Sequence, residues 1–247
     1  MGRPRTLLFD IENSPIEGWA WSTFDTNLVG VKRPTYIMAW AARWLDEKKI
    51  LARTLPDYPL YQTDPTNDSA LLQELHQLLD EADIVIAHNA NFDIKKTNGR
   101  FLINGIREPS PFKAFCTLAL ARKRFKLDSN RLDYLADVLG VGRKIRHPGF
   151  SLWQDCMQGC PKAWALMRKY NAHDVFLLHG CFEKMKGWAT NFPDANWWTG
   201  AGCCPVCQGG RIQLRGYNVS RGGRKQRIHC QDCGHWDTIG KAVKDAA

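Results

Sequence analysis

The feature that most constrains this chain is the stretch LLFDIENSP, residues 7–15, in which an apolar run leads into two acids. Such a run predicts a buried strand over residues 6–11. Because alternate residues of a strand share a face, Asp10 and Glu12 would point the same way. Two carboxylates that close repel each other unless a cation lies between them, and hard oxygen ligands suit Mg²⁺ or Mn²⁺. The pattern predicts either a divalent-metal site or two solvated acids at a strand end.

Other apolar patterns indicate the fold class. The run IVIAH, residues 84–88, predicts a strand buried on both faces. Residues 70–82 carry leucines at helical spacing, with Asp68 or Ser69 as the expected cap. Residues 35–45 and 50–55 are typical of paired strands. Two short helices are expected within residues 116–140 and a long one over residues 161–186. Strands separated by helices predict a mixed α/β sheet.

Further polar residues fall where this sheet would end. Asp93 follows the run at residues 84–88, and ligands of open α/β sheets bind at the carboxyl ends of strands. The other interpretation of Asp93 is an acid favoured by a helix start. His88 is expected to be a satisfied polar residue at the strand end. On the long helix, Tyr170 and Asp174 are four residues apart, so they share a face.

Charge indicates the class of partner. The chain carries a net charge of +9, which favours an anionic partner, nucleic acid first, over a basic protein without one. Basic residues also gather between residues 122 and 146, where they would contact phosphates or form a solvated face. No apolar run approaches the roughly 20 residues of a membrane span, and the N-terminus has no apolar signal segment. We therefore expect an intracellular protein with no membrane partner.

The cysteines predict a second metal site. Five of the nine cysteines fall after residue 202, a clustering that indicates metal ligation in a reducing compartment rather than disulfides. Two CxxC pairs with 22 residues between them supply four thiolates for tetrahedral Zn²⁺. The expected ligands are Cys204, Cys207, Cys230 and Cys233. Cys203 lies outside this spacing. Residues 200–247 hold eight Lys or Arg and three Asp or Glu, so this tail is basic.

The motifs resemble a known family when they are taken in order. Asp-x-Glu at 10–12, Asn-x-x-Phe-Asp at 89–93 and Tyr-x-x-x-Asp at 170–174 resemble the 3′–5′ exonucleases of the RNase H-like superfamily. The pattern is similar to the tyrosine branch of the four-carboxylate group, because the histidine branch would place its His at the position of Lys169. Through FDIENSP, HNANFD, SNRLDYLADVLG and YNAHDV, the chain resembles phage-encoded RNase H-like nucleases with a C-terminal zinc ribbon. Cys116 departs from that pattern, since such proteins often have Asp before Thr-Leu.

The resemblance implies an architecture. Residues 1–187 would form an α/β domain, an RNase H-like mixed sheet flanked by helices. Independently of the resemblance, the Pro, Asn and Gly residues within 188–202 predict a linker or strap, which Trp188, Trp197 and Trp198 would pack onto that domain. Residues 203–247 would form a small zinc ribbon.

The resemblance also implies an activity. It is metal-dependent 3′–5′ hydrolysis of phosphodiester bonds at single-stranded nucleic-acid ends, with DNA favoured, two Mg²⁺ or Mn²⁺ and one structural Zn²⁺. Asp10 would be the shared ligand, Glu12 and Asp174 would hold the ion that activates water, and Asp93 would complete the second site. Tyr170 would orient the attacking water. The candidate nucleic-acid contacts are Asn89, Arg221, Arg224 and Lys225.

Two alternatives stay open. One is a ribonuclease or structure-selective endonuclease on the same fold. The other is a nucleic-acid-binding protein with a silent site, which the intact set of four acids disfavours. A replication or recombination protein is a candidate partner. If the chain is phage-encoded, the host-cell cytoplasm is the expected compartment.

Overall fold

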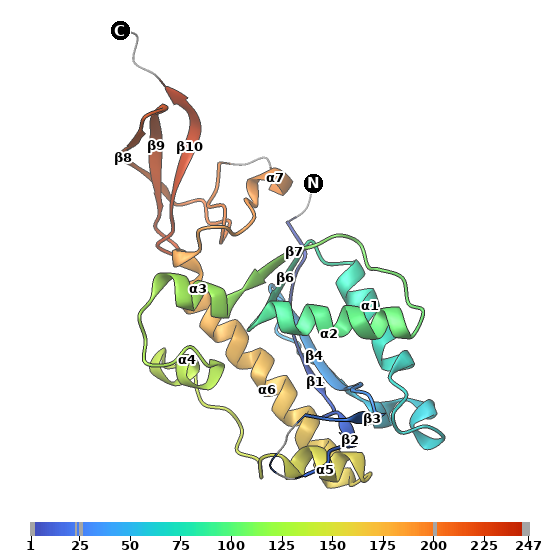
Figure 1. The fold of residues 1–247 in the computed structure, drawn as a ribbon. Helices are drawn as coiled ribbons and strands as arrows, with labels where there is room; N and C mark the ends of the chain where they lie inside the picture. The colour runs from blue at the N-terminus through green and yellow to red at the C-terminus, as the bar shows by residue number, and fades with distance from the viewer. Residues whose placement is uncertain (1–2, 23, 25–26, 200–201, 244–247) are drawn as a thin grey trace.

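A five-stranded mixed sheet forms the centre of the main domain in a computed structural model that describes residues 3–22, 24, 27–199 and 202–243 (Figure 1). The strand order is β5-β4-β1-β6-β7. The strands are β1 (Thr6–Asn13), β4 (Ile37–Trp44), β5 (Leu51–Thr54), β6 (Ile84–Ala87) and β7 (Lys113–Cys116). β1 runs antiparallel to β4 and parallel to β6. The expected mixed α/β sheet flanked by helices is confirmed.

β1 owes its central place to its apolar run, because Leu7, Leu8 and Phe9 are fully buried. Its odd and even positions face opposite layers. Leu7 and Phe9 share a buried cluster with the leucines of α1 (Ser69–Asp80). Leu8 shares another with Val175 of the long helix α6 (Pro161–Met185). Asp10 and Glu12 have the parity of Leu8, so they face α6.

The remaining helices complete the two layers. α2 (Ala90–Ile103) contacts α1, β6 and β7. On the other side, three short helices pack against α6: α3 (Thr117–Arg124), α4 (Leu132–Val138) and α5 (Ser151–Met157). Single turns of 3₁₀ helix cover Leu55–Asp57, Pro59–Gln62 and Lys186–Trp188. No helix among the described residues is both long and apolar enough to cross a membrane.

A small three-stranded antiparallel sheet follows α6, in the order β10-β9-β8. Its strands are β8 (Ile212–Ser220), β9 (Gly223–Cys230) and β10 (Trp236–Val243), and a short helix α7 (Asn196–Thr199) precedes them. Cys204 and Cys230 belong to the buried cluster that contains Phe182 of α6. Gly187 lies so close to this sheet that a Cβ there would be 2.1 Å from the Cys233 carbonyl oxygen. The small sheet, which we call the ribbon, is therefore docked on the main domain.

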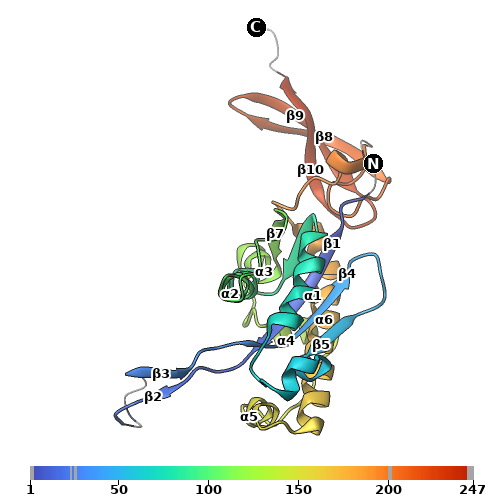
Figure 2. The same ribbon diagram turned by 90° about the vertical axis from the view of Figure 1, so that its right-hand side faces the viewer.

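A two-stranded hairpin, which the sequence did not predict, projects from the main domain between β1 and β4 (Figure 2). It consists of β2 (Glu17–Trp19) and β3 (Gly30–Arg33), which run antiparallel.

Two local predictions, the cap of α1 and the packing of the strap, differ from the structure. Asp68 precedes α1 but makes no capping hydrogen bond; its carboxylate instead binds the Arg100 guanidinium and the Ile37 N–H. Trp197 does not pack the strap onto the main domain, because it is 83% exposed. Phe192 does so, through edge-to-face contact with Phe115. Parts of the expected ranges, residues 1–2, 200–201 and 244–247, lie outside the described residues.

Candidate active site

Three acids from two elements converge between β1 and α6. Asp10 and Glu12 project from β1, and Asp174 projects from the facing side of α6, one turn after Tyr170. One carboxylate oxygen from each acid lies within 4.8 Å of the others. The convergence follows from the alternation of β1, which turns both acids toward the helix that crosses it.

Asp93 approaches the same region from a third element. It is 4% exposed and lies in the first turn of α2, which follows β6 after Asn89 in the left-handed conformation (φ 76°). The backbone N–H groups of Ile11 and of Asp93 itself interact with its carboxylate. Asp93 is not among the three acids that lie mutually within 4.8 Å, but its charge raises the pKa values of Asp10 and Glu12. All four predicted acids thus belong to one electrostatic cluster.

Burial raises the pKa of every acid in this cluster. Burial, then the Asp174 charge, raises the pKa of Glu12 to about 8. Burial also raises the pKa of Asp93 to about 7. The pKa of Asp10 stands well above its usual range, because burial and three neighbouring acids all disfavour the charged form. At neutral pH the cluster therefore needs protons or cations.

Lys144 supplies one cation from the segment between α4 and α5. Its ammonium donates hydrogen bonds to Oδ2 of Asp174 at 2.5 Å and to the Tyr170 hydroxyl at 2.9 Å. Burial alone would lower the Lys144 pKa, but Asp174 and Tyr170 raise it, so the ammonium stays charged. Burial also raises the Tyr170 pKa above its usual value, so the phenol stays neutral.

Other residues fix the orientation of these groups. The Asn171 side-chain amide donates to Oδ2 of Asp10 at 2.7 Å. The Tyr170 ring lies edge-on to His147, with 4.8 Å between centroids, and to Trp153 of α5, with 6.3 Å. Sequence reasoning missed these roles. Their signals were the Asn beside Tyr170 and the Lys-x-x-His spacing from 144 to 147, neither of which indicates a contact without the fold.

The acid cluster fits a hard divalent cation. Its donors are all carboxylate oxygens, the ligands that Mg²⁺ and Mn²⁺ prefer. Oδ1 of Asp174 is buried and has no hydrogen-bond partner among the described residues. A buried carboxylate oxygen without a partner is costly, and a coordinated cation would satisfy it. Asp10, Glu12 and Asp174 are the residues that could hold such an ion together.

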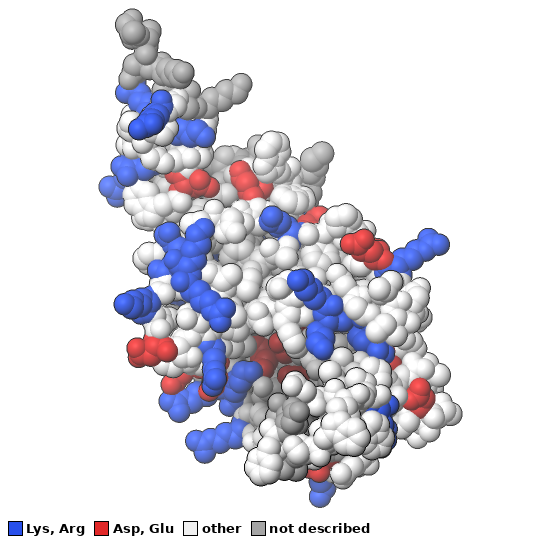
Figure 3. All heavy atoms as spheres, viewed as in Figure 1, with Lys and Arg blue, Asp and Glu red and all other residues white. Residues whose placement is uncertain are grey.

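Basic and aromatic side chains surround the cluster. Figure 3 shows acidic atoms recessed in the face viewed there, with Lys and Arg on both sides. A hollow of about 680 Å³ lies on the Lys144 side and is lined also by Arg122 and Arg131. His88 lines it too, but its ring nitrogens lie 2.9 Å from Thr117 Oγ1 and from the Asn130 carbonyl oxygen, in agreement with a structural role.

A second hollow, about 390 Å³, lies at the start of α2. It is lined by Asn89, Asn91, Phe92, Lys95 and Lys96. The predicted contact Asn89 therefore lies in the element that carries Asp93. The first hollow includes Lys144, which contacts Asp174, and the second lies on α2, which carries Asp93. Each hollow offers at least two cationic groups, which suits a polyanion.

The four predicted zinc ligands converge in the ribbon. Sγ of Cys204 lies 3.7 Å from Sγ of Cys233, and Sγ of Cys207 lies 3.6 Å from Sγ of Cys230. Four sulfurs bound tetrahedrally at about 2.3 Å would be roughly 3.8 Å apart, so the spacing fits Zn²⁺. Cys203 is not one of the group; its thiol contacts the Asn196 side chain at 3.0 Å.

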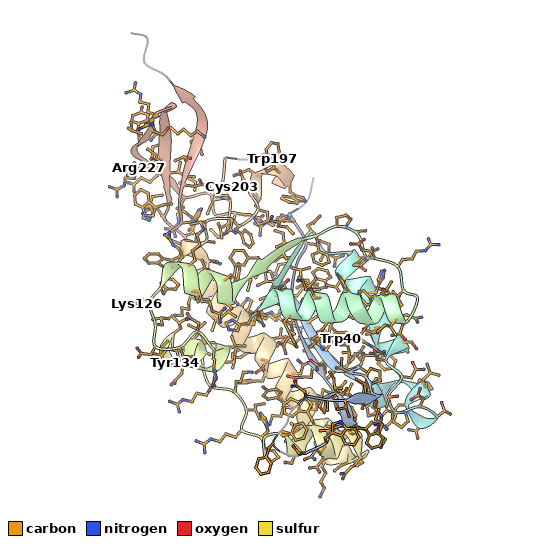
Figure 4. The ribbon with its side chains drawn as sticks, in the orientation of Figure 1. Trp40, Lys126, Tyr134, Trp197, Cys203 and Arg227 are labelled. Atoms are coloured by element: carbon orange, nitrogen blue, oxygen red, sulfur yellow. The ribbon has the colours of Figure 1, made fainter. Side chains whose placement is uncertain are left out.

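The predicted basic contacts of the tail lie away from the acids. Arg221, Arg224 and Lys225 are exposed around the turn between β8 and β9, at the far end of the ribbon (Figure 1). The Arg224 guanidinium lies 4.8 Å from the centroid of the Tyr217 ring. Arg227, labelled in Figure 4, projects from the same hairpin. This end of the ribbon could contact nucleic acid only at a distance from the acid cluster.

Comparison with known proteins supports a nuclease. Residues 61–151 match a family model described as an exonuclease, RNase_T. The matched segment contains Asp93 but neither β1 nor α6, so the other three acids lie outside it. The match supports a place in the RNase H-like exonuclease superfamily, whose members act on nucleic acids and use divalent metals. No curated protein matches the chain.

Proposed function

We propose that this chain is a metal-dependent 3′–5′ exonuclease of the tyrosine branch, acting on single-stranded nucleic-acid ends, with DNA as the favoured substrate. The observation that carries the proposal is the meeting of Tyr170 and Asp174 on one face of α6 with Asp10 and Glu12 on β1. The exonuclease match across Asp93 adds independent support.

Four acids would hold two Mg²⁺ or Mn²⁺ ions. Asp10 is proposed as the shared ligand, Glu12 and Asp174 as ligands of one ion, and Asp93 as a ligand of the other. When bound, such ions stabilise the charge on the attacking and leaving oxygens of a phosphodiester. Asn171 holds the Asp10 carboxylate in place through its amide. The protein thus supplies carboxylate oxygens in fixed positions, and burial limits their contact with bulk water.

Tyr170 positions a water molecule by hydrogen bonding. Its pKa is raised by burial, so near neutral pH the phenol keeps its proton and does not act as the general base. His147 and Trp153 restrict the ring to one orientation. Lys144 donates a hydrogen bond to the Tyr170 hydroxyl, and its ammonium would also contact a phosphate oxygen of the substrate.

The surroundings favour a flexible single strand. Arg122 and Arg131 offer phosphate contacts in the hollow that Lys144 lines, and Lys95 and Lys96 offer others along α2. Phe92, 44% exposed in the first turn of α2, offers a ring for base stacking. The ribbon would bind one structural Zn²⁺ and add affinity through Arg221, Arg224 and Lys225.

A survey of substrates tests the proposal. Purified protein is incubated with Mg²⁺ or Mn²⁺ and end-labelled single- and double-stranded DNA and RNA, beside Asp10→Asn as the inactive control. We expect metal-dependent loss of mononucleotides, fastest from single-stranded DNA. Cutting of circular single-stranded DNA would instead indicate an endonuclease, and cleavage of RNA alone a ribonuclease. Binding of every substrate without any cleavage would indicate a silent site.

A further inference from the structure

The hairpin β2–β3 presents large aromatic side chains to solvent. We call residues 17–33 the arm, of which 17–22, 24 and 27–33 are described. Trp19 is 59% exposed, Trp21 87% and Phe24 96%. Exposed apolar groups concentrated on one projection mark a binding surface more often than chance scatter does. The exposed aromatic side chains of the arm therefore indicate a binding surface.

The arm is a built hairpin with close strand contact. The Val29 N–H donates to the Trp19 carbonyl at 2.8 Å. A Cβ at Gly18 would lie 2.5 Å from the Gly30 carbonyl oxygen and 2.8 Å from the Leu28 side chain, so only glycine fits there. At the base, the Tyr36 N–H donates to Ser14 Oγ at 3.0 Å. These contacts hold the two strands of the arm together and tie its base to β1.

The hairpin itself extends from the main domain on the side viewed in Figure 1. The arm follows directly from β1, which carries Asp10 and Glu12. Figure 2 shows it extending toward the side from which Figures 1 and 3 are viewed, where the acidic atoms are recessed. Its base and α5 border a common hollow of about 310 Å³, lined by Ile16, Phe150 and Gln154. α5 also carries Trp153, which packs on Tyr170. The arm and the acid cluster are therefore connected through β1 and through α5.

The chemistry of the arm suits nucleobases rather than phosphates. Residues 17–33 contain two acids and two bases, so the arm is neutral overall. Arg33 pairs with Glu17 at 3.4 Å, and the Lys32 ammonium lies 5.8 Å from the centroid of the Trp19 ring. What the arm offers is flat π-surfaces beside a proposed nuclease site. Every base has a π-face, so stacking of this kind tolerates any sequence.

We propose that the arm holds the substrate strand by stacking Trp19, Trp21 and Phe24 on bases next to the end being removed. The inference rests on the proposed function and deepens it. It identifies how the bases of the substrate are held, while the basic residues of the main domain contact the phosphates. The occupant is a nucleic-acid strand with unpaired bases. A second copy of the chain is the competing occupant.

Binding without cleavage tests the inference separately from catalysis. Affinity is measured by fluorescence anisotropy of a 5′-labelled single-stranded DNA oligonucleotide, with full-length protein, zinc retained and no added Mg²⁺ or Mn²⁺. Trp21→Ala with Phe24→Ala should weaken binding by about 5-fold to 100-fold, the loss that removal of one or two stacked bases produces. Trp21→Phe should retain most of the affinity. Trp197→Ala is the matched control, since Trp197 is similarly exposed but lies on α7, far from the arm (Figure 1).

An abasic oligonucleotide identifies the contacted groups. Removing the bases of several nucleotides next to the 3′ end should weaken binding by the wild-type protein. On this abasic oligonucleotide the arm variant should bind only slightly more weakly than the wild-type protein, because the bases that would stack are already absent. Unchanged affinity in the arm variant, or equal losses on both oligonucleotides, would overturn the inference.

Two further readouts distinguish base stacking from self-association and from a role in catalysis alone. Arm variants whose mass in solution falls to that of the monomer, while the wild-type protein is larger, would assign the arm to self-association and overturn the inference. If the wild-type protein cleaves DNA but arm variants bind normally, the inference fails and the proposed function stands. If the arm binds bases but no nucleic acid is cleaved, the proposed function fails and the stacking surface stands. Matching thermal unfolding curves establish that the exposed substitutions leave the fold intact.

Discussion

The ammonium nitrogen of Lys144 lies 2.5 Å from Oδ2 of Asp174, which places a cation from the segment after α4 inside the acid cluster. Lys144 also donates to Tyr170, so one side chain connects the proposed metal ligand with the proposed water-orienting group. The arrangement predicts that Lys144 has opposite effects on metal binding and on cleavage.

Replacing Lys144 with Met should separate these two effects. The affinity for Mg²⁺ should rise, because Asp174 loses its competing cation. The cleavage rate at saturating metal should fall by about 10²-fold, because a charged contact to the phosphate and the support of Tyr170 are lost. Calorimetric titration with Mg²⁺ and single-turnover cleavage measure the two quantities. Lys48→Met, at an exposed turn after β4, is the control; a wild-type rate for Lys144→Met would show that this lysine plays no part in cleavage.

Substitution of the acids and of Tyr170 should give graded losses. Asp10→Ala and Asp174→Ala should each abolish cleavage, because each removes a ligand from the cluster. Tyr170→Phe should slow cleavage by about 10-fold to 100-fold but leave activity, since all four acids remain. Asp155→Asn, an exposed acid on α5, is the matched control. Wild-type cleavage by purified Asp10→Ala would mean that the site assignment is wrong.

The raised pKa of Glu12 predicts a pH-dependent stability difference. A carboxyl with a pKa of about 8 when folded and about 4.5 when unfolded binds more protons in the folded state between these values, so its contribution to stability is lost as pH rises. Without divalent metal, Glu12→Gln should therefore gain stability relative to wild type between pH 6 and pH 8.5. Thermal unfolding of both proteins across this range measures the gain, and groups common to both, such as His88, cancel. A melting-temperature difference that does not vary with pH would contradict the electrostatic description of the cluster.

Sequence periodicity was sufficient for the elements with strong apolar patterns. β1, β6 and α6 have long or continuous apolar stretches whose burial fixes their type. Because β1 alternates and α6 repeats every 3.6 residues, their polar exceptions also lie on predictable faces. The pattern therefore predicted that Asp10 and Glu12 share one face of β1 and that Tyr170 and Asp174 share one face of α6.

What the sequence could not predict depends on long-range contacts. The arm lacks a buried face, so its strands have no polar and apolar alternation to reveal them. β7 is a four-residue edge strand whose first two residues are exposed. Lys144 was one of eight basic residues between 122 and 146, and only the path of the chain after α4 brings it to Asp174. Trp197 was expected to pack the strap onto the main domain, yet it is exposed on a short helix.

Charge reversal at the ribbon tip should weaken nucleic-acid binding in a salt-dependent way. Replacing Arg221, Arg224 and Lys225 with Glu removes cations that would displace counterions from the strand. The affinity for single-stranded DNA should fall, and its dependence on salt should flatten. Reversal of Lys48 and Lys49, an exposed pair in the turn after β4, is the control. Equal affinity of the ribbon variant and wild type at two salt concentrations would leave the ribbon as a structural or docking module.

Zinc removal should unfold the ribbon locally. The four thiolates replace a hydrophobic core there, so folding and metal binding are coupled. Cys230→Ser should lower the zinc content from one equivalent and reduce amide protection in β8–β10. The main domain should keep most of its protection, because most residues of the two buried clusters that pack β1 and α6 come from the main domain. Intact protection of the ribbon without zinc would contradict the assignment of these cysteines as structural ligands.

The time course of products from a 5′-labelled single-stranded DNA tests the central claim most directly. An exonuclease acting from the 3′ end through the Asp10, Glu12, Asp93 and Asp174 cluster should produce a ladder that shortens one nucleotide at a time, only with Mg²⁺ or Mn²⁺. A blocked 3′ terminus should slow the ladder, and Asp174→Ala should abolish it. Immediate release of the labelled 5′ nucleotide, or internal cuts that a blocked 3′ end leaves unchanged, would contradict the account.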